Sequence, residues 1–316
     1  MKNIKQFLIY LLFIITSSCT SEIETLENSN NTNNLVNYIY KTYNTNNGQV
    51  LDSINFLIQE NKILSSIKHN SLTSNIYKTT YHYQNENLIE IKSYLNNSLD
   101  VITTFSYDFN GNLTQYLKEN INTINQNSQF TKHDFIHDID TIFSTTKFSL
   151  DGVNFSNSQS EYKIVIDNDN NRIYFEDKDN INNETTYKIS TYDANNNLEL
   201  EEEYLSLENQ ENTLNYYLNH NYNSGSNLFY KVNKNTYSKK TLMLLYHLQS
   251  NAINNINSKS ISPNTLSQFS TSFGNSAFNF QINNTTNNDN QTIFSDFKTL
   301  ISNELISHFS QEFIFD

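Results

Sequence analysis

The densest group of potential metal ligands is residues 133–140, HDFIHDID, which contains two histidines and three aspartates. Two histidines four residues apart on one helix face could share a zinc ion. This segment alternates like a strand instead, which places His133 and His137 about 13 Å apart, too far for one ion. It also lacks the adjacent glutamate of zinc proteases. We therefore predict solvated polar positions here and no metal site.

Residues 167–171, DNDNN, resemble the start of a calcium loop. An EF-hand loop needs glycine at its sixth position and glutamate at its twelfth. Arg172 and Lys178 stand at those positions. We interpret this segment as a hairpin turn.

Glu201, Glu202 and Glu203 could suggest carboxylates for acid–base catalysis. Strict alternation gives a simpler interpretation, in which one strand face is apolar and the other lies in water. The apolar face holds Leu198, Leu200 and Tyr204, and the wet face holds Glu199, Glu201 and Glu203. The sequence has no GxSxG, HExxH, phosphate-loop or dinucleotide motif. We predict that the protein is not an enzyme and uses no cofactor.

The tyrosine-rich strands are the remaining candidate for binding. Tyr81, Tyr83, Tyr216 and Tyr222 are our candidate ligand-binding residues. A tyrosine offers a sugar an apolar ring and a polar tip. The chain has no Trp, the residue that most often stacks on sugars. The alternative is that these rings form a thin aromatic core between curled strands.

Residues 101–120, VITTFSYDFNGNLTQYLKEN, indicate how the chain is built. Val101, Thr103 and Phe105 alternate along one strand, and Leu113 begins a second. The Asn110-Gly111 pair between them is a strong hairpin signal. The segment therefore predicts a β-hairpin.

Degraded copies of this hairpin recur along the chain. They cover residues 50–68, 77–95, 161–179, 186–205 and 214–232, and residues 121–157 interrupt the rhythm. In the last copy, Leu228, Tyr230 and Val232 are predicted to lie on the return strand. A spacing of about 20–45 residues is typical of repeat proteins, and a hairpin is not stable alone. We predict an all-β fold with one minor helix: an antiparallel meander that curls toward a barrel or stays open and covered.

The C-terminal part breaks the strand pattern. Residues 239–257 place Leu242, Leu245 and Leu248 at helical spacing. Residues 258–274 are predicted to be a loop, 277–282 and 292–297 a closing hairpin, and 305–315 a final strand. The competing prediction for residues 294–309 is a helix. The repeat domain thus spans residues 35–316, with hairpin repeats over 35–234 and the helix and closing hairpin over 235–316.

The N-terminus resembles a bacterial lipoprotein signal peptide. Lys2 and Lys5 precede the apolar stretch 7–15, and small residues lead to Cys19, the only cysteine. Nine apolar residues are too few for a spanning helix, so we predict a signal peptide over 1–18 and acylation of Cys19. Thr16 stands where Leu is most common. The alternative is ordinary cleavage with an incidental cysteine. Residues 19–34 are predicted to be a flexible tether.

Composition narrows the classes of partner. The net charge is −13, and no basic face is evident, which argues against nucleic-acid binding. The sequence has only 5 Gly and 1 Pro for its many turns. Asparagine is abundant and tolerates the left-handed backbone region, so we expect it at turn positions that otherwise favour glycine.

Hairpins of the type YxYDxNGNL behind a lipobox resemble uncharacterised Bacteroidetes lipoproteins with YD/RHS-like repeats. The matching residues are Tyr107, Asp108, Asn110, Gly111, Asn112 and Leu113, and more weakly Tyr192, Asp193, Asn195, Asn197 and Leu198. The resemblance covers about 37–234 and implies a curled sheet and a surface lipoprotein. It supplies no catalytic residues.

These observations predict a lipid-anchored outer-membrane or cell-surface protein that binds or scaffolds an unidentified glycan or protein. One alternative is a glycan-binding accessory of a nutrient-uptake system. A hydrolase with an unrecognised site is the second alternative.

Overall fold

The computed structural model describes residues 35–122, 127–182, 184–206, 212–248, 261–273, 276–301 and 304–315. These residues form one sheet and two helices. The first nine strands are β1 (Leu35–Tyr43), β2 (Val50–Gln59), β3 (Lys62–Asn70), β4 (Ile76–Gln84), β5 (Asn87–Leu95), β6 (Ser98–Tyr107), β7 (Leu113–Asn122), β8 (Asn127–Asp138) and β9 (Thr141–Ser149). They are followed by β10 (Ser160–Ile166), β11 (Arg172–Asp179), β12 (Glu184–Tyr192), β13 (Leu198–Ser206), β14 (Thr213–Ser226), α2 (Leu228–Tyr237), α3 (Lys239–Leu248), β15 (Asn264–Phe273), β16 (Ser276–Thr286), β17 (Thr292–Ile301) and β18 (Glu304–Phe315).

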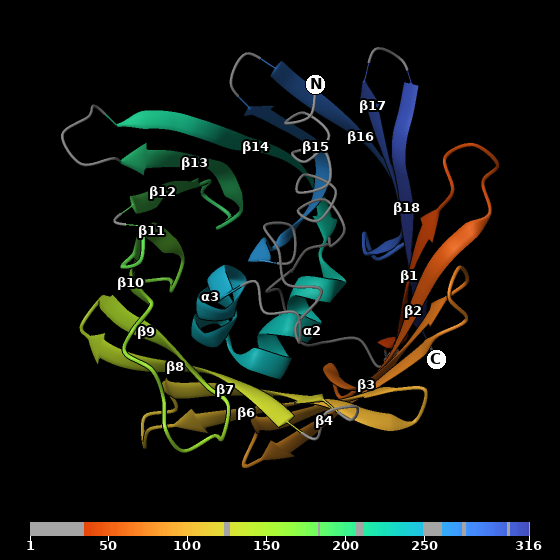
Figure 1. The fold of residues 1–316 in the computed structure, drawn as a ribbon. Helices are drawn as coiled ribbons and strands as arrows, with labels where there is room; N and C mark the ends of the chain where they lie inside the picture. The colour runs from red at the N-terminus through yellow and green to blue at the C-terminus, as the bar shows by residue number, and fades with distance from the viewer. Residues whose placement is uncertain are drawn as a thin grey trace.

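The sheet is a closed barrel of 18 antiparallel strands (Figure 1). Each strand pairs with its neighbours in sequence, and β1 closes the ring by pairing with β18, for example Tyr38 with Phe313. The prediction of an all-β antiparallel meander that curls into a barrel is confirmed. Closure removes both sheet edges, so no long unpaired strand is left to be covered.

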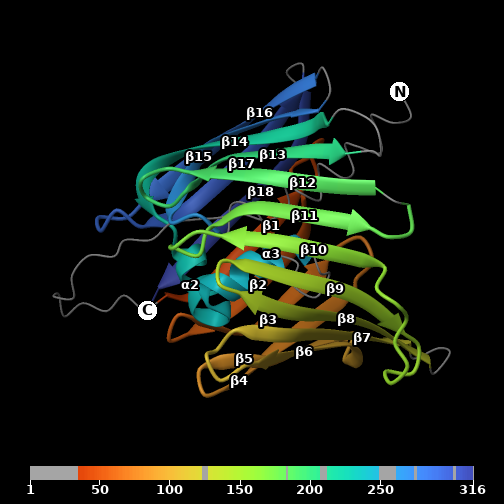
Figure 2. The same ribbon diagram turned by 90° about the vertical axis from the view of Figure 1, so that its left-hand side faces the viewer.

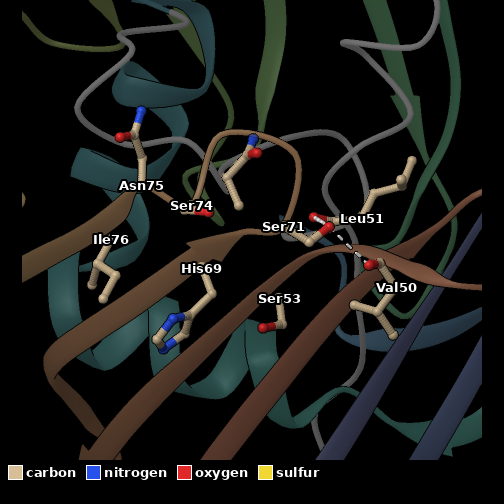
Figure 3. A pocket seen from close by; sticks show the side chains of 9 residues that line it. Val50, Leu51, Ser53, His69, Ser71, Ser74, Asn75 and Ile76 are labelled. Carbon is tan, nitrogen blue, oxygen red and sulfur yellow. Dashed lines mark hydrogen bonds between the residues drawn. The ribbon is translucent and has the colours of Figure 1, made fainter.

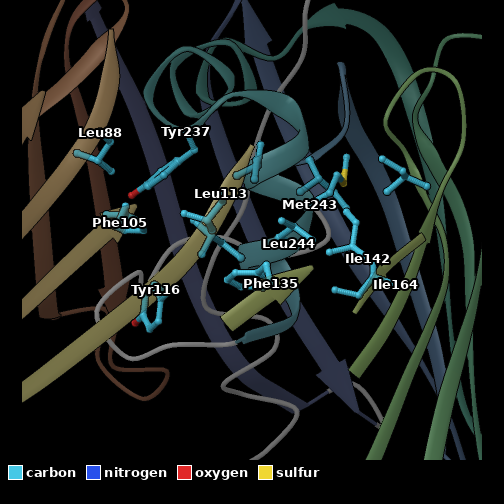
Figure 4. Close-up of a cluster of buried hydrophobic side chains, with 14 of the residues drawn as sticks. Leu88, Phe105, Leu113, Tyr116, Phe135, Ile142, Ile164, Tyr237, Met243 and Leu244 are labelled. Atoms are coloured by element: carbon cyan, nitrogen blue, oxygen red, sulfur yellow. The ribbon is translucent and has the colours of Figure 1, made fainter. Parts of the chain in front are cut away.

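The two helices lie inside the barrel near one end, as both ribbon views show (Figures 1 and 2). One buried cluster combines strands β5–β11 and β13 with Tyr237, Leu242 and Leu244 of the helices (Figure 4). A second combines β1–β3 and β14–β18 with Phe229 and Val232 of α2. The hydrophobic core therefore packs around the helix pair.

The C-terminal predictions need three corrections. Residues 228–232 were expected to be a return strand, but they begin helix α2, so the hairpin repeats end before residue 234. Asn227 caps this helix by accepting from the backbone N–H of Tyr230, and Leu228, Phe229 and Val232 are buried. The described residues thus contain two helices rather than the one expected. Residues 264–273, expected to be loop, form strand β15.

We call the end that holds the helices the helix end. The backbone N–H of Ser226, just before α2, donates to Asn290 in the β16–β17 turn. Lys240 of α3 donates to Asn112 in the β6–β7 turn at 2.9 Å. The turns within hairpins β2–β3, β4–β5, β6–β7, β8–β9, β10–β11, β12–β13 and β16–β17 all lie at this end, because the strands alternate in direction.

Four of these turns share one hydrogen-bond pattern. In the β12–β13 turn, Asp193 Oδ1 accepts from the backbone N–H groups of Asn195 and Asn197, and Oδ2 accepts from the Asn197 side chain at 2.8 Å. Turns that start at Asp108 and Asp167 repeat it. The turn that starts at Asn287 keeps the two backbone bonds to Oδ1, but there the Asn287 side-chain amide donates to Gln291. The fourth position has positive φ and is Gly111, Asn170, Asn196 or Asn290. The expectation that asparagine serves where glycine would is confirmed.

A β-bulge follows the helix-end turn in six hairpins. Tyr192 pairs with Leu198 but Thr191 pairs with Leu200, so Glu199 is left over. The equivalent unpaired residues are Leu64, Ile89, Thr114, Ile173 and Ile293. Each bulge reverses the inward–outward alternation once, so that the residue just before the unpaired one, which we call the post-turn residue, points into the core. Those residues are Ile63, Leu88, Leu113, Arg172, Leu198 and Thr292, all at most 2% exposed.

Replacing the aspartate that starts a turn tests the hydrogen-bond pattern of the four turns. We expect Asp193→Ala to lower the free energy of unfolding by about 1–2 kcal/mol, because three accepted hydrogen bonds are lost. The measurement is urea unfolding. Asn195→Ala in the same turn changes an exposed side chain and is the control. Equal losses in the two variants would show that the Asp193 carboxylate does not hold the turn.

Candidate functional site

The most highly charged part of the barrel interior is a cluster on strands β11–β14 and helix α3. Arg172, the only arginine of the chain, forms an ion pair with Glu201 and donates to Ser190 at 2.9 Å. The guanidinium carbon of Arg172 lies 4.7 Å from the ring centre of Tyr246, whose hydroxyl donates to Glu201 at 3.2 Å. Arg172 is fully buried and Glu201 is 1% exposed.

A second cation extends this ion cluster toward the other end of the barrel. The Nζ of Lys188 lies 3.9 Å from Glu201 and 3.0 Å from Glu203, and it donates to the Tyr216 hydroxyl at 2.7 Å. Burial opposes ionisation of Glu201, but Arg172 and Lys188 outweigh it and hold the pKa of this carboxyl below its usual value. The charges compensate one another, so the cluster joins β11, β12 and β13 to α3.

This arrangement corrects the predicted faces of β13. Glu201 and Glu203 were expected on a wet outer face, but both point into the barrel, whereas Leu200, Glu202 and Tyr204 lie on the outer side. The bulge at Glu199 causes the reversal. Arg172 occupies the post-turn position that holds Ile or Leu in most other hairpins, and this buried cation makes a buried Glu201 favourable.

Asp177 borders the ion cluster on β11. Phe175, two residues earlier on the same strand face, lies in the core, so Asp177 also faces inward. Burial, reinforced by the nearby Asp179, raises the pKa of Asp177 to about 6. Its Oδ1 atom is buried and makes no hydrogen bond. This carboxylate is therefore the least well compensated charge near the cluster.

The predicted tyrosines also lie inside the barrel. Tyr83 donates to the Ile63 carbonyl at 2.7 Å, and Tyr222 donates to that of Leu198 at 2.8 Å. Tyr81 packs against both core clusters, and burial raises its pKa to about 12. Tyr216 accepts from Lys188. Their packing and hydrogen bonds are those of core residues, so any ligand of these tyrosines would have to enter the barrel.

The tyrosine–carbonyl contact is part of the repeat. Tyr107 donates to the Leu88 carbonyl at 2.9 Å, and Tyr192 donates to the Arg172 carbonyl at 3.1 Å. In each case the hydroxyl of one hairpin reaches the post-turn residue of the preceding hairpin. These contacts bind successive repeats to each other inside the barrel.

A row of outward-facing tyrosines was missed by sequence reasoning. The ring centres of Tyr174 and Tyr187 lie 6.1 Å apart, and those of Tyr187 and Tyr204 lie 5.1 Å apart. Both pairs are stacked, so the rings turn their faces toward each other across three adjacent strands. Tyr174 is adjacent to Phe175 in the strand, so alternation places it on the face opposite to that buried residue. This is the signal in the sequence that marks Tyr174 as outward.

The histidine segment forms strand β8, as its alternation indicated. His133 and His137 both point inward but have different partners, Thr146 and the carbonyl of Leu113. Burial lowers the pKa of His133 to about 4. The prediction that residues 133–140 are solvated is therefore wrong for His133, which is 6% exposed. Within the part of the chain that the structure covers, no group of three or more His, Cys, Asp or Glu side chains is placed to hold a metal.

The outer wall of the barrel carries ion pairs. Glu90 with Lys92, Asp134 with both Lys132 and Lys147, and Asp296 with both Lys298 and His308 lie on the face opposite buried core residues. A barrel wall that faces lipid has an apolar band about 25 Å tall, and a lysine at its midplane costs about 2–4 kcal/mol. The outward side chains of this wall therefore include charged pairs as well as exposed apolar residues such as Leu57 and Ile67. In the described ranges, no helix is both long and apolar enough to cross a bilayer.

A shallow pocket of about 350 Å³ lies at the end away from the helices (Figure 3). It is lined by Val50, Leu51, Ser53, His69, Asn70, Ser71, Ser74, Asn75 and Ile76. Ser71 donates to the Val50 carbonyl across it at 3.0 Å. The predicted tyrosines are not among its lining residues.

Cys19 and the predicted signal peptide and tether lie outside the described residues.

The solved structures that resemble this chain include two of porin-like proteins. The one from Bacteroides uniformis has a TM-score of 0.44 at 9% identity and covers 89% of this chain and 98% of its own. The one from Bacteroides vulgatus has a TM-score of 0.34 at 9% identity, with coverages of 90% and 99%. No protein-family model and no curated protein matches the chain. The resemblance to YD/RHS-like lipoproteins therefore stays a prediction.

Removing one partner of the buried ion pair should be costly. We expect Glu201→Gln to lower the free energy of unfolding by about 3–5 kcal/mol, because the Arg172 charge stays buried without its counterion. Glu202→Gln, on the outer face of the same strand, should change it by less than about 0.5 kcal/mol. Chemical denaturation of both variants tests this. Similar losses would show that the pairing with Arg172 is not what makes Glu201 important. A large loss for Glu202→Gln alone would mean that the two faces of β13 are exchanged.

Asp177 should make stability depend on pH. Its pKa in the folded protein, about 6, exceeds the ordinary 3.8, so the folded state binds this proton more tightly. The resulting stabilisation is complete below about pH 4 and is lost as the pH rises through 6. The Asp177→Asn variant should not show this loss. The free energy of unfolding of the variant, relative to that of the wild type, should therefore increase from pH 4 to pH 7.

The neighbouring Asp179 is the control for this pH experiment. Backbone N–H groups of Ile181 and Asn182 hold the pKa of Asp179 below its usual value, so its contribution has the opposite sign. Urea unfolding of Asp177→Asn and Asp179→Asn across this range separates the two. An unchanged pH profile for Asp177→Asn would contradict the raised pKa.

Proposed function

We propose that the protein is a lipid-anchored barrel of the outer membrane or cell surface and acts as a non-enzymatic binding or scaffold module. The observation that carries this proposal is the polarity of the barrel. Ion pairs such as Glu90 with Lys92 lie on the outer wall, and the apolar core lies inside. A wall of this kind favours water over lipid, so attachment to a membrane requires a separate anchor.

Cys19 supplies that anchor in this proposal. It follows an apolar stretch and small residues in the arrangement of a lipoprotein signal. Two or more acyl chains on one residue suffice for stable attachment. Residues 1–18 would be removed, and residues 19–34 would connect the lipid to β1.

A binding or scaffold role fits the interior better than catalysis does. The helix pair and two apolar clusters occupy the barrel. Glu201 and Glu203 are paired with cations, and the shallow pocket away from the helices has His69 as its one titratable lining residue among those described. The repeated strands and polar outer wall offer a large, rigid surface to a partner.

Cys19→Ala tests the anchor in the full chain. Because the acyl chains would be lost, we expect the variant in the soluble fraction after cell lysis, whereas the wild type pellets with membranes and needs detergent for release. Ser17→Ala keeps a small residue before the cysteine and should behave like the wild type.

Retention of the Cys19→Ala variant in membranes washed with alkaline carbonate would overturn the proposal. That result would show that the barrel wall itself is integrated in the bilayer. Immunoblots of the fractions report both outcomes.

A further inference from the structure

Two neighbouring turns at the helix end present large apolar side chains to solvent. Phe109, in the β6–β7 turn, is 98% exposed, and Ile139, in the β8–β9 turn, is 95% exposed. Ile136 and Phe143 are cross-strand partners beside them on the outer wall and are also exposed. We call Phe109, Ile136, Ile139 and Phe143 the apolar tip patch.

The two turns are held side by side. Strand β7 pairs with β8, and His137 Nε2 donates to the Leu113 carbonyl at 2.7 Å, next to both turns. Phe109 and Ile139 therefore lie exposed on neighbouring turns at one end of the barrel, so a flat surface that met this end could contact both side chains.

Ile139 is unfavourable where it stands. Its φ is +52°, in the left-handed region that β-branched residues rarely adopt. Positive φ at other helix-end turns is taken by residues such as Glu60, Asn61 and Asn85. Neither backbone geometry nor packing within the barrel favours isoleucine here. A strained and fully exposed apolar residue points to a contact outside the barrel.

The start of β1 indicates what that contact is. Leu35 packs in the same cluster as Leu228, and Tyr38 stacks on Phe229 of α2 at 4.3 Å, so β1 begins at the helix end. The tether predicted for residues 20–34 would span about 20 Å as a flexible coil. A nine-residue strand such as β1 is about 30 Å long. A lipid on Cys19 thus brings the helix end, rather than the far end, to the bilayer.

Exposed apolar side chains also occur at the far end, in several loops. They are Leu72, Leu150, Val153 and Ile181. The position of the tether, not exposure alone, separates the two ends. Asp108 and Asp140 flank the tip patch, which disfavours an anionic lipid surface and favours a zwitterionic one.

We propose that the apolar tip patch inserts into the zwitterionic surface of the bilayer that holds the acylated Cys19, so that the barrel stands with its helix end on the membrane. This inference rests on the proposed lipid anchor. Phe109 and Ile139 enter the interfacial region, while the polar outer wall stays in water.

A site-specific fluorophore in the lipidated full chain tests the orientation. The sequence has one cysteine, which is acylated, so an added cysteine is the only thiol for labelling. Asn110→Cys puts a polarity-sensitive dye beside the intact Phe109, and Thr73→Cys puts the same dye at the far end. In vesicles of phosphatidylcholine and phosphatidylethanolamine, we expect blue-shifted emission and quenching by spin-labelled lipid at position 110 and neither at position 73.

Removing the patch supplies the matched control. Phe109→Ser with Ile139→Asn, in the Asn110→Cys background, should return emission and quenching to the level at position 73. Ile139→Asn relieves the positive-φ strain, so the melting temperature should not fall, which separates loss of contact from loss of folding.

The other outcomes overturn the inference in distinguishable ways. Quenching at position 73 instead of 110 would mean that the far end faces the membrane. Quenching at neither position, with protein that floats with vesicles, would leave the anchor intact and refute insertion of the patch. Protein that does not float would refute the lipid anchor itself, and the orientation with it.

Discussion

The bulge after each helix-end turn is the constraint on which the rest of the structure depends. In six hairpins one extra residue reverses the alternation and points the post-turn residue just before it into the core. Tyrosine hydroxyls of the next hairpin then bond to the carbonyl of that residue, as Tyr107 does with Leu88. Without the bulge, Leu113 and Leu198 would lie in water, and the helix pair would lose its apolar lining.

The same constraint accounts for the buried ion pair. Arg172 stands at a post-turn position, so it must point inward, where an unpaired cation would be very unfavourable. The bulge at Glu199 brings Glu201 to the inner face of β13 at the height of Arg172. Tyr246 of α3 completes the contact, so the cluster positions α3 as well as the strands.

Local chemistry allowed much of the fold to be predicted. Asp193 and Asn197 define their turn through bonds within five residues, and so do Asp108 and Asn112, which is why hairpins were predicted where they occur. The faces of β13 could not be predicted, because a bulge becomes visible only when Leu198 is paired with Tyr192. Helix α2 was missed because residues 228–232 alternate as well as a strand does. Contacts inside the barrel decide between the two, since Leu228 and Phe229 are both buried although they are adjacent in sequence.

Less of the candidate sites than of the fold could be predicted from the sequence. Tyr81 and Tyr216 were identified as a possible sugar platform, but aromatic content alone does not distinguish the core from an exposed face. The outward-facing row, with Tyr187 and Tyr204, required knowledge of which strands are neighbours. Ile139 attracts no notice in the sequence, and its positive φ and exposure mark it only in the folded chain.

Residue pattern alone determined the antiparallel hairpins and the turn chemistry, because each depends on residues close together in the chain. The N-terminal lipoprotein signal is likewise predicted from neighbouring residues, and it lies outside the described residues. The folded barrel decided which face of each strand is buried, how the ring closes between β1 and β18, and where the helices lie. Those features depend on contacts between residues far apart in sequence. Pairings such as Tyr38 with Phe313 are energetically favourable only once the intervening strands have assembled into one sheet.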